Sequence, residues 1–419
     1  MSKFDVVVIG GGAGGVASAC GAAMTGAKVA LVEQYGFLGG CATNSSVLAY
    51  CGFFSRSRER VVEGVGREFL DRLDRQELYQ THTFANTGNT VVLLDRETTK
   101  RTLDEMVADH GVEVFHHTTL YDAESEDTAT GKKIRAALLT HRGGLMRLEA
   151  DQFIDASGDG VLMHRAGARL QVSDVEQRQA STLVMTIGGV APGNEPSQED
   201  MERAVAAYNA QYGANLGISN GTCVRSPLTG ELMLLAADAH RDVLDAAELS
   251  KAEIHGRQDV AAYHRAFKEN LPGFSDSWLA QTGPQIGIRE SRRIQGLSTV
   301  VAQDVLTARK RPTDGIARCG WPIEDHSRAG ETEYVSIEGD GWYHIPFGAL
   351  ASDNVENLWS AGRLVSADAR AFASVRVMGT AFATGHAAGV AAATALENPE
   401  RSSIVSTVRA RLEEQGALV

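Results

Sequence analysis

The fold is decided by residues 4–15, which read FDVVVIGGGAGG. An apolar run typical of a buried strand leads into a glycine-rich turn, and a helical run of small residues follows it. In this pattern Gly10 allows the tight turn, Gly12 lets the backbone approach a pyrophosphate, and Gly15 lets the helix pack closely on the strand. The stretch therefore predicts the first strand, turn and helix of a nucleotide-binding βαβ unit.

The second strand of the unit is predicted over residues 28–33, KVALVE, which end in an acidic residue. The carboxylate of Glu33 is placed to accept a hydrogen bond from a ribose hydroxyl, and its charge repels a 2′-phosphate. The free N–H groups at the start of the helix, beside Ala13 and Gly14, point at the pyrophosphate. Because both strands, the helix and the acid are in register, we expect a dinucleotide site rather than a glycine-rich turn without a ligand.

Length and composition narrow the class of protein. A chain of 419 residues is too long for one ordinary domain, so we expect two or three structural units. A hydrophobic content of 43% with 22% charged residues is typical of a soluble globular protein, and no apolar stretch reaches the length of a membrane span. The net charge of −13 argues against a nucleic-acid partner.

Cysteine and histidine spacing gives no indication of a metal site. The five cysteines form no CxxC pair, and the twelve histidines include no HExxH motif. An odd number of cysteines, with no cationic region before the first apolar segment, predicts reduced thiols and a cytoplasmic location. The pair His116-His117 is expected in a strand, with its two rings on opposite faces.

Helices and strands that suit a nucleotide-binding domain are predicted in both terminal parts of the chain. Periodicity predicts a helix over residues 95–110, a strand over 112–115 and a hairpin over 133–148. A helix of small residues is expected over 379–396, and a last amphipathic helix over 404–414.

The middle of the chain has a different character. Between about residues 170 and 350, polar helices alternate with strands rich in valine, leucine and threonine. We therefore predict an α/β fold with a discontinuous nucleotide-binding domain of residues 1–169 and 351–419. We expect residues 170–350 to form an inserted α+β domain, which acts as a cap or substrate domain.

Four stretches resemble FAD-dependent oxidoreductases of the glutathione-reductase superfamily, related to fumarate reductase flavoproteins and thiazole-synthesis flavoproteins. They are the first βαβ unit with GGCAT at 39–43, FIDASGDG at 153–160, GIRESRRI at 287–294, and WYHIPF, NLWSAGR and SVRVMG within 342–379. Residues 368–373, DARAFA, depart from the family pattern, in which polar or histidine residues are common there. The resemblance implies a Rossmann-like FAD-binding domain of the glutathione-reductase type with an inserted α+β substrate or cap domain.

The resemblance also implies which residues contact FAD. The start of the helix near Gly379 is expected to face the N1/C2=O edge of the flavin, where its dipole stabilises negative charge. A covalent link through Cys41 is an alternative to non-covalent binding. The implied cofactor-binding residues are Gly10, Gly12, Ala13, Gly14, Gly15, Glu33, Gly39, Gly40, Cys41, Ala156, Asp159, Gly362, Arg376 and Met378.

Five side chains are candidates for the reaction itself. Arg289 and Arg293 are four residues apart, so they are expected on one face, and a guanidinium suits a substrate carboxylate. The alternative is that these arginines pair with Glu290 or other acids and hold the domains together. Arg376 is expected beside the flavin ring. Tyr343 and His344 lie where the chain re-enters the FAD-binding domain; His344 is either a general base or a structural histidine.

These observations favour an FAD-dependent dehydrogenase or oxidase that passes a hydride from a small polar organic molecule to flavin N5. A reductase of an activated C=C bond and a flavin-binding protein without turnover are the alternatives. A single GxGxxG with a full βαβ context indicates that a second nucleotide domain is lacking. The electron acceptor is then oxygen, a quinone or a redox protein.

Overall fold

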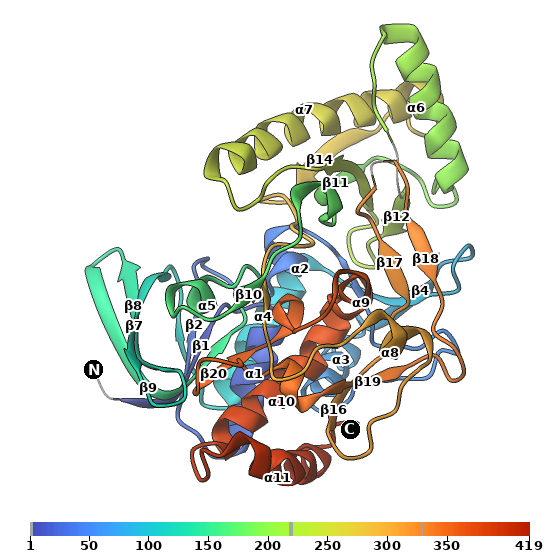
Figure 1. Ribbon diagram of the computed structural model, residues 1–419. Coiled ribbons are helices and arrows are strands. Elements are labelled where there is room, and N and C mark those ends of the chain that lie inside the picture. The colour runs from blue at the N-terminus through green and yellow to red at the C-terminus, as the bar shows by residue number, and fades with distance from the viewer. Residues whose placement is uncertain (1–2, 218–220, 329) are drawn as a thin grey trace.

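The computed structural model describes residues 3–217, 221–328 and 330–419 (Figure 1). Within these residues the largest sheet has seven strands, in the order β6-β2-β1-β9-β8-β7, with β20 paired to β9. The strands are β1 (Phe4–Ile9), β2 (Val29–Val32), β6 (Glu113–Phe115), β7 (Thr119–Asp127), β8 (Lys132–His141), β9 (Gly144–Asp155) and β20 (Leu358–Ser360).

Strand β9 belongs to two kinds of sheet at once. Its first half pairs antiparallel with β8, and its second half lies parallel between β1 and β20, with Ile154 opposite both Val8 and Trp359. The strands β6, β2, β1, β9 and β20 thus form a parallel layer, as predicted for the nucleotide-binding unit. The predicted hairpin at residues 133–148 is confirmed as β8 and the start of β9.

Two small-residue helices pack backbone to backbone behind the glycine turn. They are α1 (Ala13–Met24) and α10 (Met378–Thr394). A Cβ atom at Gly385 would lie 2.2 Å from the carbonyl oxygen of Gly14, and one at Gly389 would lie 2.1 Å from that of Ser18. Only glycine permits so close a crossing at these positions, which explains why the sequence of α10 consists largely of glycine and alanine.

Other predicted helices of this part are also confirmed. They are α4 (Arg96–Asp109), which Asp95 caps by accepting from the Thr98 N–H, and α11 (Arg401–Glu414). In α11 the stripe Ile404, Val408 and Leu412 is buried, as the periodicity indicates. Helices α3 (Val65–Asp74) and α5 (Val161–Arg165) complete the set around the sheet.

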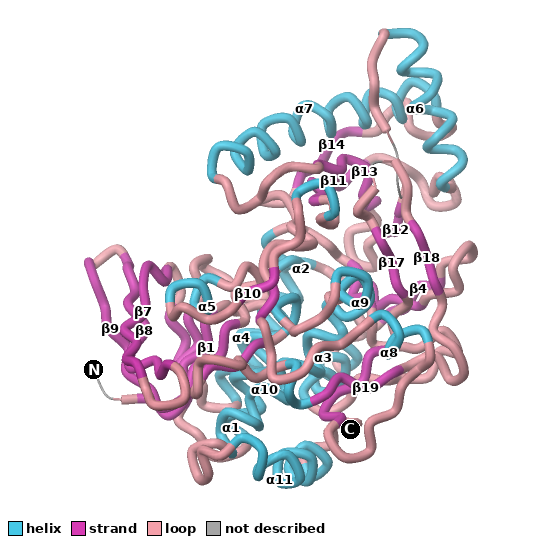
Figure 2. The backbone as a smooth tube through the Cα atoms, viewed as in Figure 1, coloured by secondary structure: helices cyan, strands magenta, loops and turns pink. Residues whose placement is uncertain are grey.

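A second sheet projects from the first part, with two long helices on one side of it (Figures 1 and 2). Its order is β12-β13-β11-β14, and its core is separate from that of the seven-stranded sheet. It comprises β11 (Ser181–Gly188), β12 (Thr222–Arg225), β13 (Leu232–Ala239), β14 (Trp278–Thr282), α6 (Gln198–Tyr212) and α7 (Ala246–Asn270). These elements fall inside the stretch 170–350, although the predicted domain boundaries themselves stay a prediction.

The remaining strands and helices are short. They are β3 (Ala49–Cys51), β4 (Gln80–Thr83) and β5 (Thr90–Leu93) in one small sheet, the pairs β10 (Leu170–Gln171) with β15 (Arg293–Ile294), β16 (Gly315–Cys319) with β19 (Tyr343–Pro346), and β17 (Ile323–Asp325) with β18 (Glu333–Val335), and the helices α2 (Cys41–Asn44), α8 (Ala302–Leu306) and α9 (Ala369–Val375).

One local prediction is wrong. His116 and His117 lie in a turn between β6 and β7 rather than in a strand, and His117 has a φ of +51°. The strand ends at Phe115 because the chain there turns back to begin β7 at Thr119. His116 Nδ1 lies 3.2 Å from the carbonyl oxygen of Tyr35, so it contacts the loop after β2.

Candidate active site

A cavity of about 680 Å³ opens at the carboxyl ends of the parallel strands. The residues that follow β1, β2, β9 and β20 all line it, which is the usual ligand position in an open parallel sheet. Its volume lies within the range of roughly 300–1,000 Å³ expected for small-molecule and cofactor sites. At one end it reaches Glu33, and at the other it reaches Arg376 and the hairpin β17–β18.

The glycine turn forms one wall of this cavity. Gly10 has a φ of +100°, and a Cβ atom there would lie 2.6 Å from the carbonyl oxygen of Ala156. A Cβ at Gly15 would lie only 1.7 Å from the Gly10 carbonyl, so this glycine serves helix packing. At Gly12 the nearest atom to such a Cβ is the Gly40 Cα at 3.5 Å, so the protein itself leaves room there. A side chain at Gly12 would fill this free space.

Gly12 is also the N-cap residue of α1, and it has no side chain that could bond the N–H groups of the first turn. Gly12, Ala13 and Gly14 all line the cavity. A helix start without a capping side chain leaves donors and a positive dipole end for an anionic ligand. The arrangement fits the pyrophosphate of a dinucleotide.

The loop before α2 closes against the glycine turn. The Gly39 N–H donates to the Gly11 carbonyl at 2.8 Å, and both Gly39 (φ +116°) and Gly40 (φ +55°) adopt backbone conformations that favour glycine. Cys41 begins α2 beside them and also lines the cavity. A Cβ at Gly39 would lie 2.6 Å from the Thr43 side chain and one at Gly40 would lie 2.8 Å from the Gly12 Cα, so both positions suit glycine.

Glu33 is held rigidly at the end of β2. Its side chain is buried, and its carboxylate accepts from the N–H groups of Gly11 at 2.7 Å and Tyr35 at 2.9 Å. Burial raises the pKa of Glu33 despite these hydrogen bonds, which lower it. The carboxylate thus links the loop after β2 to the glycine turn and lies at the edge of the cavity.

The loop after β9 supplies a second polar group. Asp159 lines the cavity, lies 3.4 Å from Arg363 and accepts from the Ser291 hydroxyl at 2.9 Å. Gly362 also lines the cavity, with a φ of +65°, and its N–H donates to the Thr384 hydroxyl at 3.1 Å. Ser291 therefore ties the 287–294 stretch to the FIDASGDG stretch at 153–160, a contact between two of the four matching stretches.

At the opposite end of the cavity two arginines line the wall. Arg376 directly precedes α10, and its Nη2 donates to the backbone carbonyl of Glu324 at 2.9 Å. Its Nε is buried and has no hydrogen-bond partner among the described residues. Arg289 donates to the Ala180 carbonyl at 2.7 Å and to the Thr182 hydroxyl, and lies 3.5 Å from Asp238.

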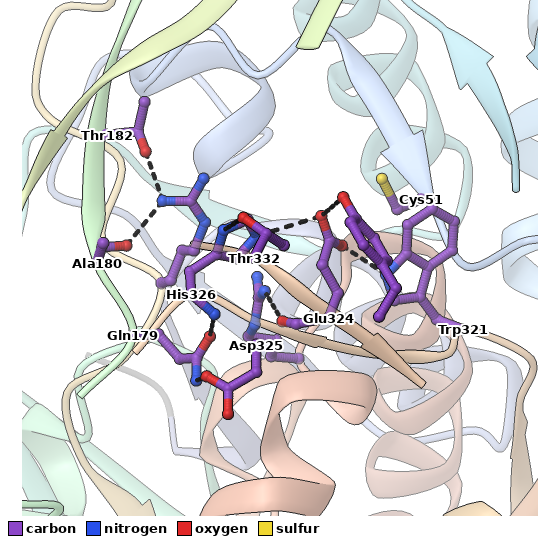
Figure 3. A network of polar contacts seen from close by, with 12 residues as sticks. Cys51, Gln179, Ala180, Thr182, Trp321, Glu324, Asp325, His326 and Thr332 are labelled. Carbon is purple, nitrogen blue, oxygen red and sulfur yellow. Dashed lines mark hydrogen bonds and ion pairs between the residues drawn. The ribbon is translucent and has the colours of Figure 1, made fainter. Parts of the chain in front are cut away.

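Glu324, which lines the cavity together with these arginines, is the centre of a polar network (Figure 3). Its carboxylate accepts from Trp321 Nε1 at 2.8 Å and from the Tyr334 hydroxyl at 2.9 Å, and lies 3.2 Å from His326 Nε2. Burial raises the pKa of Glu324, but His326, Arg376 and the Trp321 hydrogen bond outweigh it, so the net pKa is below its ordinary value. The side chain is ionised at neutral pH.

His326 in the same network is uncharged. Burial and the charge of Arg289 lower its pKa below the ordinary value near 6.5, although Glu324 opposes this. Since a carboxylate only accepts hydrogen bonds, the ring proton is on Nε2, facing Glu324. Nδ1 lies 3.1 Å from the Thr332 hydroxyl, and the backbone N–H donates to Gln179 at 2.8 Å. Both ring nitrogens of His326 and its backbone N–H therefore have hydrogen-bond partners.

The structure brings most of the predicted residues to this cavity. All the predicted cofactor-binding residues line it except Gly15, which packs α1 against the turn, and of the reaction candidates Arg289 and Arg376 line it. Which of them contact FAD or substrate stays a prediction.

Three reaction candidates do not line the cavity. Arg293 is buried in β15 and pairs with Glu290, so the expectation that it shares a face with Arg289 is wrong. The segment between them is irregular, and the regular spacing assumed for a helix or strand does not apply. Tyr343 bonds Ser374 at 2.9 Å. His344 Nδ1 accepts from the Arg311 N–H at 2.8 Å, and burial lowers its pKa to about 4.

Sequence reasoning missed the network around Glu324. Residues 319–326 read CGWPIEDH, in which Glu324 and His326 are two positions apart. In a strand this spacing puts both side chains on one face, and β17 ends at Asp325 between them. An acid and a histidine on one face of a short strand are therefore a signal that was present in the sequence.

Comparison with known proteins identifies the family. A model of the FAD dependent oxidoreductase family matches residues 5–412 of the chain. The chain belongs to this family. Its cofactor is therefore FAD, and the glycine turn, the helix start and Glu33 described above fit that group.

Sequence relatives with curated names match only parts of the chain. Glutathione reductase of Schizosaccharomyces pombe is 63% identical over 41 residues, which is 10% of this chain and 9% of that protein. A soluble pyridine nucleotide transhydrogenase of Mycobacterium bovis is 26% identical over 171 residues, 39% of this chain and 36% of that protein. The chain thus spans about a third or less of the length of these relatives.

Among solved structures, a geranylgeranyl bacteriochlorophyll reductase-like protein from Thermoplasma acidophilum has a similar fold. The TM-score is 0.53 with 15% sequence identity, over 100% of this chain and 84% of that one. This likeness supports the Rossmann-like α/β fold. In the described part of the chain, no helix is both long and apolar enough to cross a membrane, and no cluster of three or more candidate ligands could hold a metal ion.

Proposed function

We propose that FAD lies extended along the cavity, with its adenosine end at Glu33 and its flavin ring at the Arg376 end. Two helix starts support this orientation: α1 faces the middle of the cavity through Gly12, and α10 faces the far end through Met378. The dipole of α1 suits the pyrophosphate, and that of α10 suits negative charge on the ring.

We further propose that the protein oxidises a small polar organic molecule that carries an anionic group. Bound FAD supplies the chemistry, by accepting a hydride at flavin N5. The observation that carries the substrate assignment is the buried Nε of Arg376, which has no partner among the described residues. A buried donor without an acceptor is costly, so an acceptor group of the ligand is expected there.

The other residues of this end hold the substrate in place under the same proposal. Arg289 is fixed by the Ala180 carbonyl and by Thr182, so its guanidinium is preorganised to bind a carboxylate. The hydroxyl of Tyr334 and the ring of His326 line the same end of the cavity. The sheet β11–β14 with α6 and α7 would act as the cap, since β11 contributes Thr182 to the wall.

A second candidate is the reverse type of reaction, reduction of an activated C=C bond, as the resemblance to fumarate reductase flavoproteins suggests. The hydroxyl of Tyr334 favours it, because a C=C reductase needs a proton donor beside the ring. Burial and the charge of Glu324 raise the pKa of Tyr334, so its hydroxyl carries its proton at neutral pH but is a weaker acid than an ordinary tyrosine. It lines the cavity and donates to Glu324.

Anaerobic mixing experiments test and separate these functions. Purified holoprotein is mixed with 2-hydroxy acids and 2-amino acids, and loss of the visible flavin absorbance is followed. Dithionite-reduced protein is mixed with unsaturated carboxylic acids, and recovery of absorbance is followed. A dehydrogenase or oxidase gives the first signal, a C=C reductase the second, and a protein without turnover gives neither. Arg289→Gln is expected to weaken the response to any acid that gives one.

The substrate-reduced protein can also be used to identify the electron acceptor. After a substrate has reduced the flavin, air, a soluble quinone or a ferredoxin-type protein is added. The rates at which these acceptors reoxidise the flavin are then compared. We propose that the fastest of these identifies the acceptor class.

A further inference from the structure

The charged groups at the Arg376 end of the cavity fall into two sets. Arg289 has its own counter-charge, since Asp238 lies 3.5 Å away and both side chains are mostly buried. The Nη2 of Arg376 donates to the backbone carbonyl of Glu324. The carboxylate of Glu324 accepts from Trp321 and Tyr334 and lies 3.2 Å from His326 Nε2.

We propose that Glu324 and Arg376 act as opposed fixed charges that set the reduction potential of the bound flavin. The inference rests on the proposed function in one respect, the placement of the flavin ring at this end of the cavity. Reduction adds negative charge to the ring, so a fixed cation beside it stabilises the reduced form and a fixed anion destabilises it. The effect is large where water is excluded, because the effective dielectric constant is low.

The geometry makes Glu324 suitable for this role. Trp321 Nε1, Tyr334 Oη and His326 Nε2 all surround its carboxylate, and each of these atoms is a donor there (Figure 3). Donors to both oxygens stabilise the ionised form, and the mostly buried position of the side chain reduces screening by salt. The carboxylate is therefore a permanent negative charge on the wall of the cavity, and its position is fixed by the hairpin β17–β18.

Arg376 is fixed just as firmly, but on a different element. It follows α9 and precedes α10, and its Nη2 is bonded to the chain of β17 through the Glu324 carbonyl at 2.9 Å. The two charges therefore keep a constant separation, and neither can move to follow the charge on the ring. A fixed pair of this kind contributes to the potential without reorganisation when the flavin is reduced.

The test is the midpoint potential of the FAD-loaded protein, measured by equilibration with redox dyes at constant pH. Glu324→Gln is expected to favour the reduced form about tenfold, a positive shift of about 30 mV for a two-electron couple. Arg376→Gln is expected to shift the potential in the opposite direction by a similar amount. In the double variant the shifts largely cancel, to within about threefold of the unmodified protein.

A matched control uses the same chemical change at a solvent-facing position on the partner strand. Glu333 is on β18, exposed, and paired with Arg370 at 2.9 Å. Glu333→Gln is expected to leave the potential within about threefold of the unmodified value, because water and salt screen the lost charge. Glu324→Asp, which keeps the charge, is expected to stay closer to the unmodified protein than Glu324→Gln.

The outcomes separate this inference from the proposed function. If neither Arg376→Gln nor Glu324→Gln shifts the potential, the ring is not at this end of the cavity and the placement of FAD is wrong. If Arg376→Gln lowers the potential while Glu324→Gln does not raise it, the placement stands and the role of Glu324 is overturned. Should Glu324→Gln fail to fold, Tyr334→Phe removes one donor without removing a charge. The potential then becomes more negative, and a positive shift or none contradicts the inference.

Discussion

Gly12→Val is the sharpest test of where the cofactor binds. A Cβ at this position lies 3.5 Å from the Gly40 Cα, an ordinary contact, so the protein can accommodate it. The backbone of Gly12 (φ −73°, ψ −175°) is one that valine readily adopts. The expected cost in folding free energy is about 1 kcal/mol, the usual difference between a good and a poor N-cap residue.

The effect on FAD is expected to be much larger. Valine would fill the gap between Gly12 and Gly40 and separate the pyrophosphate from the N–H groups of α1. Each charge-assisted hydrogen bond contributes roughly 1.5–3 kcal/mol, so loss of one weakens binding about 10- to 150-fold. The assay is thermal unfolding with and without added FAD, since a ligand at about 100 times its Kd stabilises by about 2.7 kcal/mol. At the same FAD concentration the unmodified protein should be stabilised by about 2.7 kcal/mol, and Gly12→Val by only about 0.3 to 1.4 kcal/mol.

Gly15→Ala is the contrasting control for that experiment. Its Cβ would overlap the Gly10 carbonyl oxygen at 1.7 Å, so α1 must move away from the turn. Overpacking of this kind costs about 1–3 kcal/mol or more, and stability should fall with or without FAD. Equal FAD binding by Gly12→Val and the unmodified protein would refute the placement of the pyrophosphate, and equal destabilisation of the two glycine variants would refute the steric reasoning.

Further predictions concern single side chains. Glu33→Arg should reduce the FAD content of purified protein, whereas Glu413→Gln, exposed on α11, should not; equal contents would place the ribose elsewhere. Arg376→Ala should retain FAD but slow flavin reduction by substrate about 10- to 1,000-fold in stopped-flow experiments, and a near-normal rate would make this arginine structural. Arg289→Ala should mainly weaken apparent substrate affinity. Burial lowers the pKa of His386 from 6.5 to about 4. As the pH falls, this histidine therefore gains a proton in the unfolded chain at a higher pH than in the folded protein. Unfolding free energy should drop by about 2 kcal/mol between pH 7 and pH 5 on this account, and the drop should shrink in His386→Gln.

The part of the site made by backbone was predictable from sequence. The turn at Gly10, the packing at Gly15 and the approach at Gly12 each require the absence of a Cβ, and the distances confirm the first two requirements. A requirement for glycine is visible in a sequence without any knowledge of the tertiary contacts. The strands β1 and β2 and the helix α1 were predictable for a related reason, since the apolar runs and glycine spacing that specify them all lie within residues 4–33.

The part made by side chains was not predictable in the same way. Arg289 and Arg293 were treated as a pair by spacing, yet Arg293 is committed to the buried acid Glu290. His344 was a candidate general base because it lies near the domain junction, with a structural role as the alternative; its Nδ1 accepts a hydrogen bond from the Arg311 N–H, which fits the structural alternative. In each case a partner distant in the chain or on an irregular segment decides the role, and periodicity carries no information about such partners.

Family membership therefore predicts cofactor binding at the Glu33 end of the cavity, but it does not predict the substrate or the potential at the Arg376 end. The Glu33 end is built from the first βαβ unit, where the nucleotide is recognised mainly by backbone and one acid, so any member that keeps this unit can bind the cofactor. The Arg376 end is built from side chains of β17, β18, the 287–294 stretch and the start of α10, which meet only in the folded chain. Because each of those segments can change its side chains without disturbing the glycine turn, substrate and potential can diverge while FAD binding persists. The residues to examine for the reaction of this protein are thus Glu324, Arg376 and Arg289 rather than the motif that reveals its cofactor.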